Sequence, residues 1–411
     1  MRRARTSSRP PVRRGGLTRR TLLAHTLGAA AVTLTPRDVS GQGRPDSADR
    51  PGRPPNELGT RSAAEQPKRM PSAISSRTPL QDLHGTITPA DLHFERHHAG
   101  VPALDPRTYR LLVHGMVERP TTFSLDDLKR FPSSSRICFL ECSGNFGRQS
   151  GERTTVQELC GLTSQSEWTG VRLSTLVREV GARPQATWFL AEGQDAALMT
   201  RSIPMKDVLE EAMIVYAQNG EALRPEQGYP ARLLLPGMEG NASVKWLRRL
   251  ELADQPFMTR EETSKYTDPL ADGSARQFSF VIDARSVITS PSYQHTVQPG
   301  WTEIRGIAWS GRGRVERVEV STDGGRTWTA AELQAPVLPK AHTRFRLLWR
   351  WDGAATEIVS RAVDQTGYVQ PDWKTLQTLR GRRTRYHLNP VTGWKIGADG
   401  RVVFGIERVA G

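Results

Sequence analysis

The sequence is poor in cysteine and has no apolar segment long enough to cross a membrane. Its 411 residues include three cysteines, Cys138, Cys142 and Cys160, and none lies in a Cys-x-x-Cys-His motif, which excludes covalent attachment of a c-type haem to this chain. An odd number of cysteines leaves at least one thiol outside any intrachain disulfide bond. The apolar run at residues 22–34 is shorter than the ~20 residues that a spanning helix needs. We therefore expect no membrane span in the mature protein.

Acidic residues are outnumbered by basic ones, 43 against 57, which gives a formal net charge of +14. More than half of this excess lies in the first 36 residues, which contain eight arginines and no acid. The remainder is only mildly basic, so we expect no nucleic acid as a partner. Its basicity is concentrated near the C-terminus, where the pattern fits either a patch for an anion or acidic partner or a solvated tail: Arg380, Arg382, Arg383 and Arg385.

Residues 1–36 have the pattern of an export signal. Arg19 and Arg20 lie in the run Thr-Arg-Arg-Thr-Leu-Leu, directly before the short apolar stretch. Twin-arginine signals mark proteins that are exported already folded, commonly because a cofactor is inserted first. An ordinary secretory signal is the alternative reading of this pattern. We expect export to the periplasm by the twin-arginine route.

Four further regions follow the signal, and together they predict an α+β protein. Residues 37–79 are rich in Pro, Gly, Ser, Arg and Asp and predict a flexible lead-in. Residues 80–262 predict an α+β domain, with helices at 173–180 and 205–212, and with a strand at 213–217 that precedes a turn at Asn219-Gly220. Residues 278–390 alternate short strand-like runs with glycine-rich turns, which predicts a β-sandwich, and 391–411 would form a tail.

The segment most suggestive of chemistry is Arg136-Ile-Cys-Phe-Leu-Glu-Cys-Ser-Gly-Asn-Phe-Gly-Arg148. It predicts a strand that runs into a glycine-containing loop with Cys142 at its end. A thiol in this position could bind a soft metal, act as a nucleophile or fill a gap in the core. From these residues alone, packing is the most common role of a single cysteine.

Several separated segments together resemble the sulfite oxidase family of molybdopterin enzymes, over most of the chain after about residue 83. The segments are Phe94-Glu-Arg-His-His-Ala-Gly-Val-Pro102, Cys142-Ser-Gly-Asn145, Trp168-Thr-Gly-Val-Arg-Leu173, Glu192-Gly-Gln-Asp195, Gly228-Tyr-Pro-Ala-Arg232 and the run from Pro236 to Trp246. The resemblance implies a molybdopterin-binding domain followed by an immunoglobulin-like dimerisation domain, the latter resembling the family around Val318-Glu-Val-Ser-Thr-Asp-Gly-Gly-Arg-Thr-Trp328.

The resemblance also assigns roles to individual residues. Cys142 would supply the thiolate ligand of molybdenum, which a soft sulfur donor suits. The cofactor-binding residues would be Phe94, Glu95, Arg96, His97, His98, Asp195, Gln227, Arg232, Ser243, Val244 and Lys245. The position of Gln227 is often histidine in the family, which weakens its assignment. Surface solvation is the alternative for Arg232 and Lys245, but their apolar flanks favour a buried anion.

Three residues would face the substrate, together with Cys142. Arg96 resembles an anion-binding arginine, Tyr266 resembles a pocket tyrosine, and Arg380 resembles an arginine contributed by the second domain. Arg148 is a weaker candidate, because it lies one to two residues farther from Cys142 than the family pattern places it. Packing is the alternative for Tyr266, and solvation for Arg380. The spacing of His93, His97, His98 and His114 predicts no metal site, and structural or solvent roles are expected for His93 and His114.

The function implied by the resemblance is oxygen-atom transfer from molybdenum to sulfur, with electrons passed to a separate c-type cytochrome. Within the family, Glu-Cys-Ser-Gly-Asn, Ser-Lys-Tyr-Thr-Asp-Pro and Trp394-Lys-Ile-Gly-Ala-Asp-Gly400 are most similar to the sulfane dehydrogenase subunit of the thiosulfate-oxidising Sox system. That similarity implies a substrate sulfur on a carrier protein, a dihaem cytochrome partner and a homodimer or heterotetramer. Oxidation of free sulfite, a non-catalytic exported binding protein and a methionine sulfoxide reductase are the alternatives.

Overall fold

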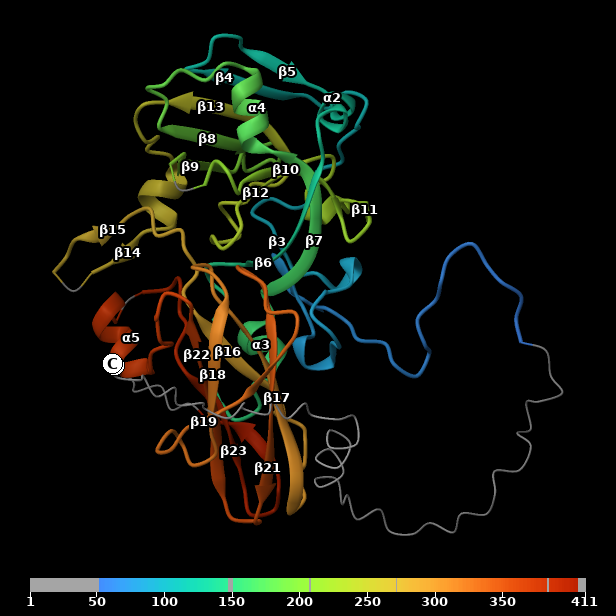
Figure 1. Ribbon diagram of the computed structural model, residues 1–411, viewed down its shortest axis with the longest axis vertical. Helices are drawn as coiled ribbons and strands as arrows, with labels where there is room; N and C mark the ends of the chain where they lie inside the picture. The colour runs from blue at the N-terminus through green and yellow to red at the C-terminus, as the bar shows by residue number, and fades with distance from the viewer. Residues whose placement is uncertain (1–51, 147–150, 207, 271, 383, 406–411) are drawn as a thin grey trace, which may run out of the picture. The chain divides into compact units, whose positions relative to one another are not determined.

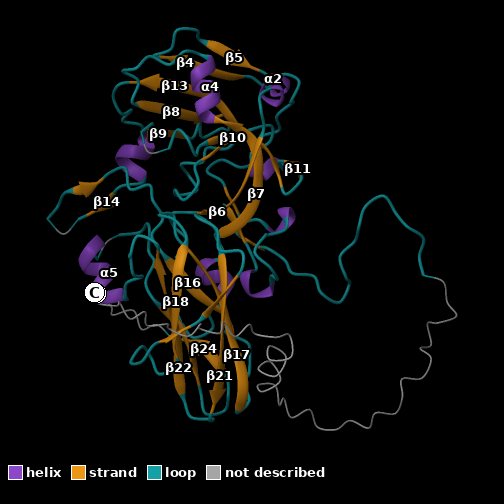
Figure 2. Cartoon of the chain, in the orientation of Figure 1, coloured by secondary structure: helices purple, strands orange, loops and turns teal. Residues whose placement is uncertain are grey.

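The computed structural model describes residues 52–146, 151–206, 208–270, 272–382 and 384–405. The chain divides into two units, residues 1–61 and residues 62–411. Of the first unit, the described residues 52–61 form neither helix nor strand, and the expected export signal lies outside the described residues. The elements named below belong to the second unit, in which strands predominate and helices are few and short (Figure 2). This composition agrees with the predicted α+β class.

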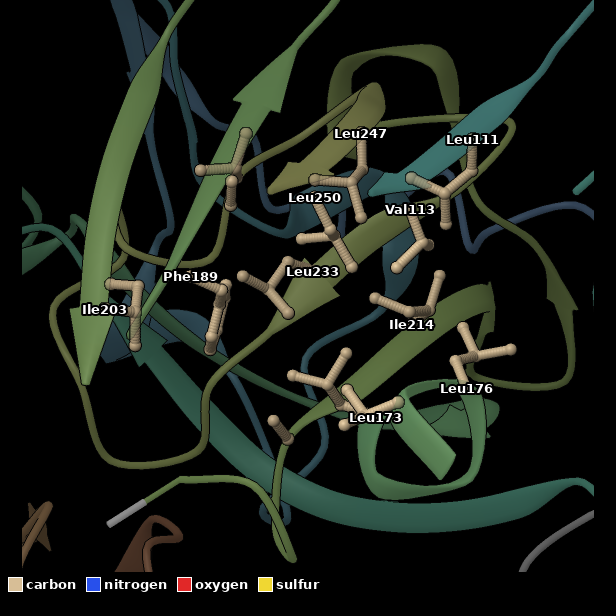
Figure 3. Packing of buried hydrophobic residues seen from close by; sticks show 14 of the residues in the cluster. Leu111, Val113, Leu173, Leu176, Phe189, Ile203, Ile214, Leu233, Leu247 and Leu250 are labelled. Carbon is tan, nitrogen blue, oxygen red and sulfur yellow. The ribbon is translucent and has the colours of Figure 1, made fainter. Parts of the chain in front are cut away.

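One sheet of the second unit has the strand order β5-β4-β13-β8-β9. Its strands are β4 (Leu111–Gly115), β5 (Thr121–Phe123), β8 (Trp188–Gly193), β9 (Thr200–Pro204) and β13 (Leu247–Ala253). Only the pair of β4 and β13 is parallel among the pairs of this sheet. Apolar side chains of these strands meet those of helix α4 (Leu173–Glu179) and of neighbouring strands in one core (Figure 3): Leu111, Val113, Leu173, Leu176, Phe189, Ile203, Ile214, Leu233, Leu247 and Leu250.

A second sheet has the order β11-β10-β7-β6, and β12 pairs with β10 outside that path. Its strands are β6 (Ser134–Glu141), β7 (Thr163–Arg172), β10 (Met213–Gln218), β11 (Glu221–Ala222) and β12 (Arg232–Leu234). Asn219 and Gly220 form the turn between β10 and β11 with φ of 51° and 81°, as the dipeptide predicts. β6 is paired with β7 along its whole length and ends at Glu141, so Cys142 begins the loop that follows.

Two short helices precede and follow β6, and each begins with a capping box. Ser124 and Asp127 cap α2 (Leu125–Arg130), while Thr155 and Glu158 cap α3 (Val156–Cys160). In both, the side chain of the cap and that of the third residue exchange hydrogen bonds with the backbone, which satisfies N–H groups that lack helical partners. Short elements complete this half of the unit: η1 (Leu80–Asp82), η2 (Ala90–Leu92), η3 (Pro225–Gln227), η4 (Glu261–Lys265), β1 (Met70–Pro71), β2 (Ser75–Arg77), β3 (Glu95–Arg96), β14 (Asp268–Pro269) and β15 (Ala275–Arg276).

The predicted β-sandwich is present as two sheets, with orders β16-β17-β21-β20 and β19-β18-β22-β23-β24. Their strands are β16 (Arg285–Ser290), β17 (Gly300–Trp309), β18 (Val315–Ser321), β19 (Thr329–Ala330), β20 (Glu332–Gln334), β21 (Thr343–Trp351), β22 (Thr356–Asp364), β23 (Thr392–Ile396) and β24 (Val402–Phe404), and α5 (Trp373–Arg380) precedes β23 (Figure 1). Buried aromatic residues fill the space between the sheets, including Trp309, Phe345 and Trp394. Trp394 Nε1 donates to the Ile288 carbonyl at 2.9 Å, which satisfies its polar atom inside the core.

The structure corrects three expectations about these elements. Among residues 205, 206 and 208–212 there are a bend and turns rather than the expected helix, because their i to i+3 and i to i+4 hydrogen bonds reach only the carbonyls of Met205 and Val208. Residues 391–405 are not a tail, since β23 pairs with β22 and β24 with β23, and the rest of the expected tail lies outside the described residues. The end of the expected lead-in is ordered, because β1 and β2 pair with each other and β2 pairs with β3.

No helix in the described part of the chain is long and apolar enough to cross a membrane.

Candidate functional site

A cavity of about 360 Å³ opens around the side chain of Cys142. Its walls come from segments that are far apart in the sequence: the β3 region, the end of β6, the loop after β8, the stretch from η3 to β13, and the end of η4. Every predicted cofactor-binding residue lines it, namely Phe94, Glu95, Arg96, His97, His98, Asp195, Gln227, Arg232, Ser243, Val244 and Lys245, and so does Tyr266. The fold therefore gathers in one place the segments that the sequence singled out.

Cys142 is held in position by its backbone. Its N–H donates to the Leu162 carbonyl at 3.0 Å, and its carbonyl accepts the Asn145 N–H at 2.9 Å. The side chain of Asn145 donates from Nδ2 to Glu141 Oε1 at 2.8 Å and accepts the Leu162 N–H on Oδ1 at 2.7 Å. These two bonds connect the loop to the end of β6 and to the residue before β7. Burial raises the pKa of the Cys142 thiol, while the Gly144 N–H and Arg96 favour the thiolate. A metal ion bound here would displace the thiol proton.

Arg232 and Lys245 are cations of the cavity wall for which the described residues provide no counter-ion. Arg232 is 3% exposed and donates to the carbonyls of Gln227 and Ser243, at 3.0 and 2.8 Å. Lys245 Nζ donates to the carbonyls of Arg96 and Glu226, at 3.2 and 2.9 Å. Among the described residues neither forms an ion pair, and burial lowers the pKa of both. Such charges are costly to bury unless an anion neutralises them.

His97 connects Lys245 to an acidic residue across the cavity wall. Its Nδ1 lies 2.8 Å from Lys245 Nζ, and its Nε2 lies 2.7 Å from Glu95 Oε2. Because the ammonium group can only donate, Nδ1 accepts and Nε2 carries the proton. Glu95 also pairs with Arg69 at 3.1 Å, and the bond from His97 lowers its pKa. His97 is thus oriented from both ring nitrogens.

Other predicted cofactor-binding residues have partners that fix the cavity walls. Gln227 is 2% exposed and donates to the Phe94 carbonyl at 2.9 Å, so this side chain ties η3 to the β3 region. Asp195 Oδ1 accepts the Met199 N–H at 3.1 Å, and Ser243 Oγ accepts the Leu235 N–H at 2.9 Å. These bonds shape the loops that line the cavity.

The predicted substrate residues are not all at the cavity. Arg96 and Tyr266 line it, and the Tyr266 hydroxyl lies 3.0 Å from His98 Nε2. Arg380 is not among the lining residues: its guanidinium is buried against two carboxylates, Asp283 at 2.5 Å and Asp268 at 3.7 Å. The structure thus supports neither a substrate contact nor the alternative of a solvated side chain for Arg380. Arg148 lies outside the described residues.

The C-terminal basic patch is only partly formed. Burial removes Arg380 from it, and Arg383 lies outside the described residues, while Arg382 and Arg385 are exposed.

Sequence reasoning missed several lining residues, of which Tyr386 is the most informative. It comes from the segment between α5 and β23, and its ring lies 5.3 Å from that of Tyr266. Lys265, Asn241 and His93 also line the cavity, and burial lowers the pKa of His93 to about 3, so this histidine is neutral. The only sequence signal for Tyr386 was its place inside the arginine-rich segment, which was interpreted as a charge patch.

The residues present fit the cofactor that the sequence resemblance implies. Among the described residues, no three His, Cys, Asp or Glu side chains cluster so that they could hold a metal ion, so Cys142 would be one donor beside those of a bound organic group. The two uncompensated cations suit an anionic group such as the phosphate of a pterin cofactor. Asn241 Oδ1 and His93 Nε2, both buried at the cavity, have no hydrogen-bond partner among the described residues.

Comparisons with known proteins agree with this geometry. Residues 98–261 match the family model of the oxidoreductase molybdopterin binding domain, and residues 276–393 match that of the Mo-co oxidoreductase dimerisation domain. The crystal structure of the sulfane dehydrogenase SoxCD from Paracoccus pantotrophus is similar, with a TM-score of 0.79 and 43% identity, over 92% of this chain and 98% of that chain.

Curated relatives include sulfite oxidases and nitrate reductases. The mitochondrial sulfite oxidase of Rattus norvegicus is 33% identical over 74% of this chain, and the chain covers 62% of that protein. The NADH nitrate reductase of Ulva prolifera is 31% identical over 77% of this chain, which covers 42% of it. The sulfite oxidase of Gallus gallus is 32% identical, with 80% of this chain and 76% of the relative covered. The chain therefore belongs to the sulfite oxidase family of molybdopterin oxidoreductases.

Proposed function

We propose that this protein oxidises an anionic sulfur compound at a molybdenum ion bound by Cys142 and passes the electrons to a separate c-type cytochrome. One observation carries the proposal: the Cys142 thiol shares a cavity with Arg232 and Lys245, two cations that no described carboxylate pairs with. A thiolate donor beside a cradle for anions is what a metal held in an anionic organic group requires.

The side chains divide into two groups by what they would hold. Cys142 would bind the metal, while Arg232, Lys245 and the tautomer-fixed His97 would hold the anionic parts of the molybdopterin. When bound, this group supplies a two-electron redox centre that can transfer an oxygen atom to sulfur. The protein contributes position and charge, which cost no reorganisation during the reaction if they are fixed beforehand.

Arg96, Tyr266 and Tyr386 would hold the substrate against this centre. Arg96 is close enough to Cys142 to favour its ionised form, so its charge reaches the place where sulfur would react. Burial raises the pKa of Tyr266 above its usual value, so its hydroxyl keeps its proton and acts as a hydrogen-bond donor. A cation and two phenols suit an anionic substrate whose charge is carried on oxygen or terminal sulfur.

We propose sulfane sulfur on a carrier protein as the substrate. The support is the 43% identity to the Paracoccus pantotrophus sulfane dehydrogenase, of which the chain covers 98%. Free sulfite is the second candidate, because the rat and chicken relatives are sulfite oxidases. We further propose a homodimer formed through the dimerisation domain or a heterotetramer with a dihaem c-type cytochrome, and export to the periplasm by the twin-arginine route.

The first experiment tests the metal and the direction of the reaction. The protein is purified after export from cells grown with molybdate or with tungstate, and its metal and pterin contents are measured. Reduction of cytochrome c is then followed with sulfite and with thiosulfate conjugated to a carrier protein. We expect cytochrome reduction by the molybdate-grown protein alone, fastest with the carrier-bound substrate. If the molybdate-grown protein contains neither molybdenum nor pterin, the proposal is refuted. If cytochrome reduction is faster with sulfite than with the carrier-bound substrate, free sulfite becomes the proposed substrate.

The second experiment tests the substrate pocket. Arg96→Ala should weaken substrate capture and raise KM more than it lowers kcat, because the lost charge acts on the bound anion. An unchanged KM would argue against this role for Arg96.

A further inference from the structure

The residue before Cys142 makes an unusually complete set of buried contacts. The Glu141 carboxylate is buried and accepts Asn145 Nδ2 at 2.8 Å, Arg285 Nη1 at 3.1 Å and Trp309 Nε1 at 2.6 Å. Its backbone carbonyl accepts the Gly240 N–H at 2.6 Å. A buried carboxylate with three side-chain donors has one low-energy position, because any displacement leaves charge and donors unpaired.

Two of these donors belong to the sandwich. Arg285 is the first residue of β16, Trp309 is the last residue of β17, and the two are directly paired in the sheet. Arg285 also donates to the Asn145 carbonyl at 2.7 Å, and its guanidinium lies 5.4 Å from the Phe146 ring centre. The pair of β16 and β17 therefore contacts the cysteine loop on both sides of Cys142 in the sequence, at Glu141 and at Asn145.

A third part of the sandwich half contacts the same loop. The His387 N–H donates to the Ser143 carbonyl at 2.8 Å, directly after Cys142. His387 Nε2 lies 3.3 Å from Glu239 Oε2, so this contact is itself fixed by a buried carboxylate. On the opposite side, the Cys142 N–H is held by the Leu162 carbonyl. Cys142 itself lines the cavity, together with Ser143 and Gly144.

We propose that Glu141, Arg285 and Trp309 are positioning residues for the metal ligand Cys142, so that the sandwich completes the metal site in addition to any role in dimerisation. None of the three would touch the metal, and each acts through the loop that carries the thiol. The inference rests on the proposed function only in taking Cys142 as the ligand. It needs no assumption about the substrate or the electron acceptor.

The test measures how firmly the loop is held in full-length protein made in cells that cannot synthesise the pterin. Alkylation of Cys142 by iodoacetamide is followed by peptide mass spectrometry, and the rate is read at alkaline pH where it no longer rises. Changes of thiol ionisation then do not contribute. Cys138 and Cys160, both 0% exposed, report any general unfolding. Glu141→Gln should raise the Cys142 rate about tenfold and Trp309→Phe about threefold, because each removes a bond that opposes local opening.

The second readout is the molybdenum content of protein made in cells that contain the cofactor, which should fall in the same order. The matched control is Arg344→Met. Arg344 Nη2 donates to the Leu83 carbonyl at 2.7 Å, so it too links β21 of the sandwich to the other half, and its side-chain hydrogen bonds go to Leu83 and Gly85 rather than to the cysteine loop. This variant should keep the wild-type alkylation rate and metal content.

Equal alkylation rates in Glu141→Gln, Trp309→Phe and the control would overturn the proposal, whatever the activity assays show. If Glu141→Gln does not accumulate as folded protein, Trp309→Phe decides alone, because it removes one hydrogen bond and keeps an aromatic ring in the core. Failure of the proposed substrate or acceptor would leave these rates unaffected.

Discussion

Two pairs of buried cations in the described part of this molecule have different kinds of partner. Arg232 and Lys245, on the cofactor side of the cavity, donate to backbone carbonyls and form no ion pair among the described residues. Arg201 and Arg285, which are not among the lining residues of the cavity, are paired with carboxylates at 2.7 to 3.1 Å. All four belong to the same unit.

This difference distinguishes cations that stabilise the fold through ion pairs from cations that are available to bind an anionic ligand. Arg201 is 1% exposed and is enclosed by Glu239 and Glu262, which raise its pKa above the usual value despite burial. Burial lowers the pKa of Lys245, because only more distant carboxylates oppose it. A charge that the protein buries without compensation is an observation that favours binding of an anion. The following predictions test this division.

The largest expected effect is the loss of activity when the thiol of Cys142 is replaced. Cys142→Ser should abolish sulfur-dependent cytochrome reduction, because a hydroxyl is a poor donor for the metal that the cavity is proposed to hold. The free energy of unfolding should change by less than ~1 kcal/mol, since the substitution changes little volume in a partly open site. Activity assays and urea unfolding measure both quantities, and retained turnover would contradict the assignment. Cys138→Ser is the control, and it should leave activity in place.

Breaking the paired set should damage the fold. Arg201→Met should lower the free energy of unfolding by roughly 3–5 kcal/mol, because it removes the arginine that both buried carboxylates, Glu239 and Glu262, pair with. Urea unfolding of the cofactor-free protein measures the change. Arg361→Met is the matched control: its pair with Glu319 at 2.6 Å is partly exposed, so the loss should stay below ~1 kcal/mol. Equal losses in the two variants would remove the distinction between buried and exposed pairs.

The ion pairs of Arg201 and Arg285 could not be derived from the sequence, whereas most of the residues that line the cavity around Cys142 could. The resemblance to the sulfite oxidase family assigned Cys142, Arg232 and Lys245 to one cofactor, because each lies in a short segment that matches the family. Arg201 and Arg285 lie in ordinary strand sequences, and their partners Glu239, Glu262 and Glu141 are 38 to 144 residues away in the chain. Such pairings depend on tertiary packing.

The same limit explains the errors at the level of elements. Short strand-like runs between glycine-rich turns predicted the sandwich, and β21 and β22 are two of its strands. The spacing at residues 205–212 also fitted a helix, but turns between two strands place apolar side chains on one side equally well. Strands β23 and β24 were missed because Gly393, Gly397 and Gly400 interrupt the apolar pattern. Gly393 is required there, since a Cβ would lie 2.3 Å from the Ile358 carbonyl oxygen.

Acid should lower the free energy of unfolding in a defined pH range, because the buried carboxylate of Glu239, which pairs with Arg201, then takes up a proton. Burial alone would raise the pKa of Glu239, but Arg201, His387 and Asn241 lower it from 4.5 to about 2. The unfolded chain binds this proton at higher pH than the folded one, so the contribution to stability is complete above pH 4.5 and is lost as the pH falls toward 2. Between pH 4.5 and 3 the loss should be about 1.6 kcal/mol. Urea unfolding across this range measures it, and Glu239→Gln should show a shallower dependence. Identical slopes would show that Glu239 is not responsible.

The smallest change in the free energy of unfolding is expected for Lys245→Met, in contrast to the large change expected for Arg201→Met. In cofactor-free protein, Lys245→Met removes a charge that burial disfavours and also three hydrogen bonds, to the carbonyls of Arg96 and Glu226 and to His97 Nδ1. These two effects oppose each other, so the free energy of unfolding should change by no more than ~1 kcal/mol.

In cells that make the cofactor, the same variant should lose most of its bound molybdenum and pterin, because the ammonium group is then needed to neutralise the ligand. Unfolding of the cofactor-free protein and metal analysis of the loaded protein must therefore give opposite rankings of Arg201→Met and Lys245→Met. A large loss of stability in cofactor-free Lys245→Met would mean that this cation, too, holds the fold, and the distinction between the two regions would disappear.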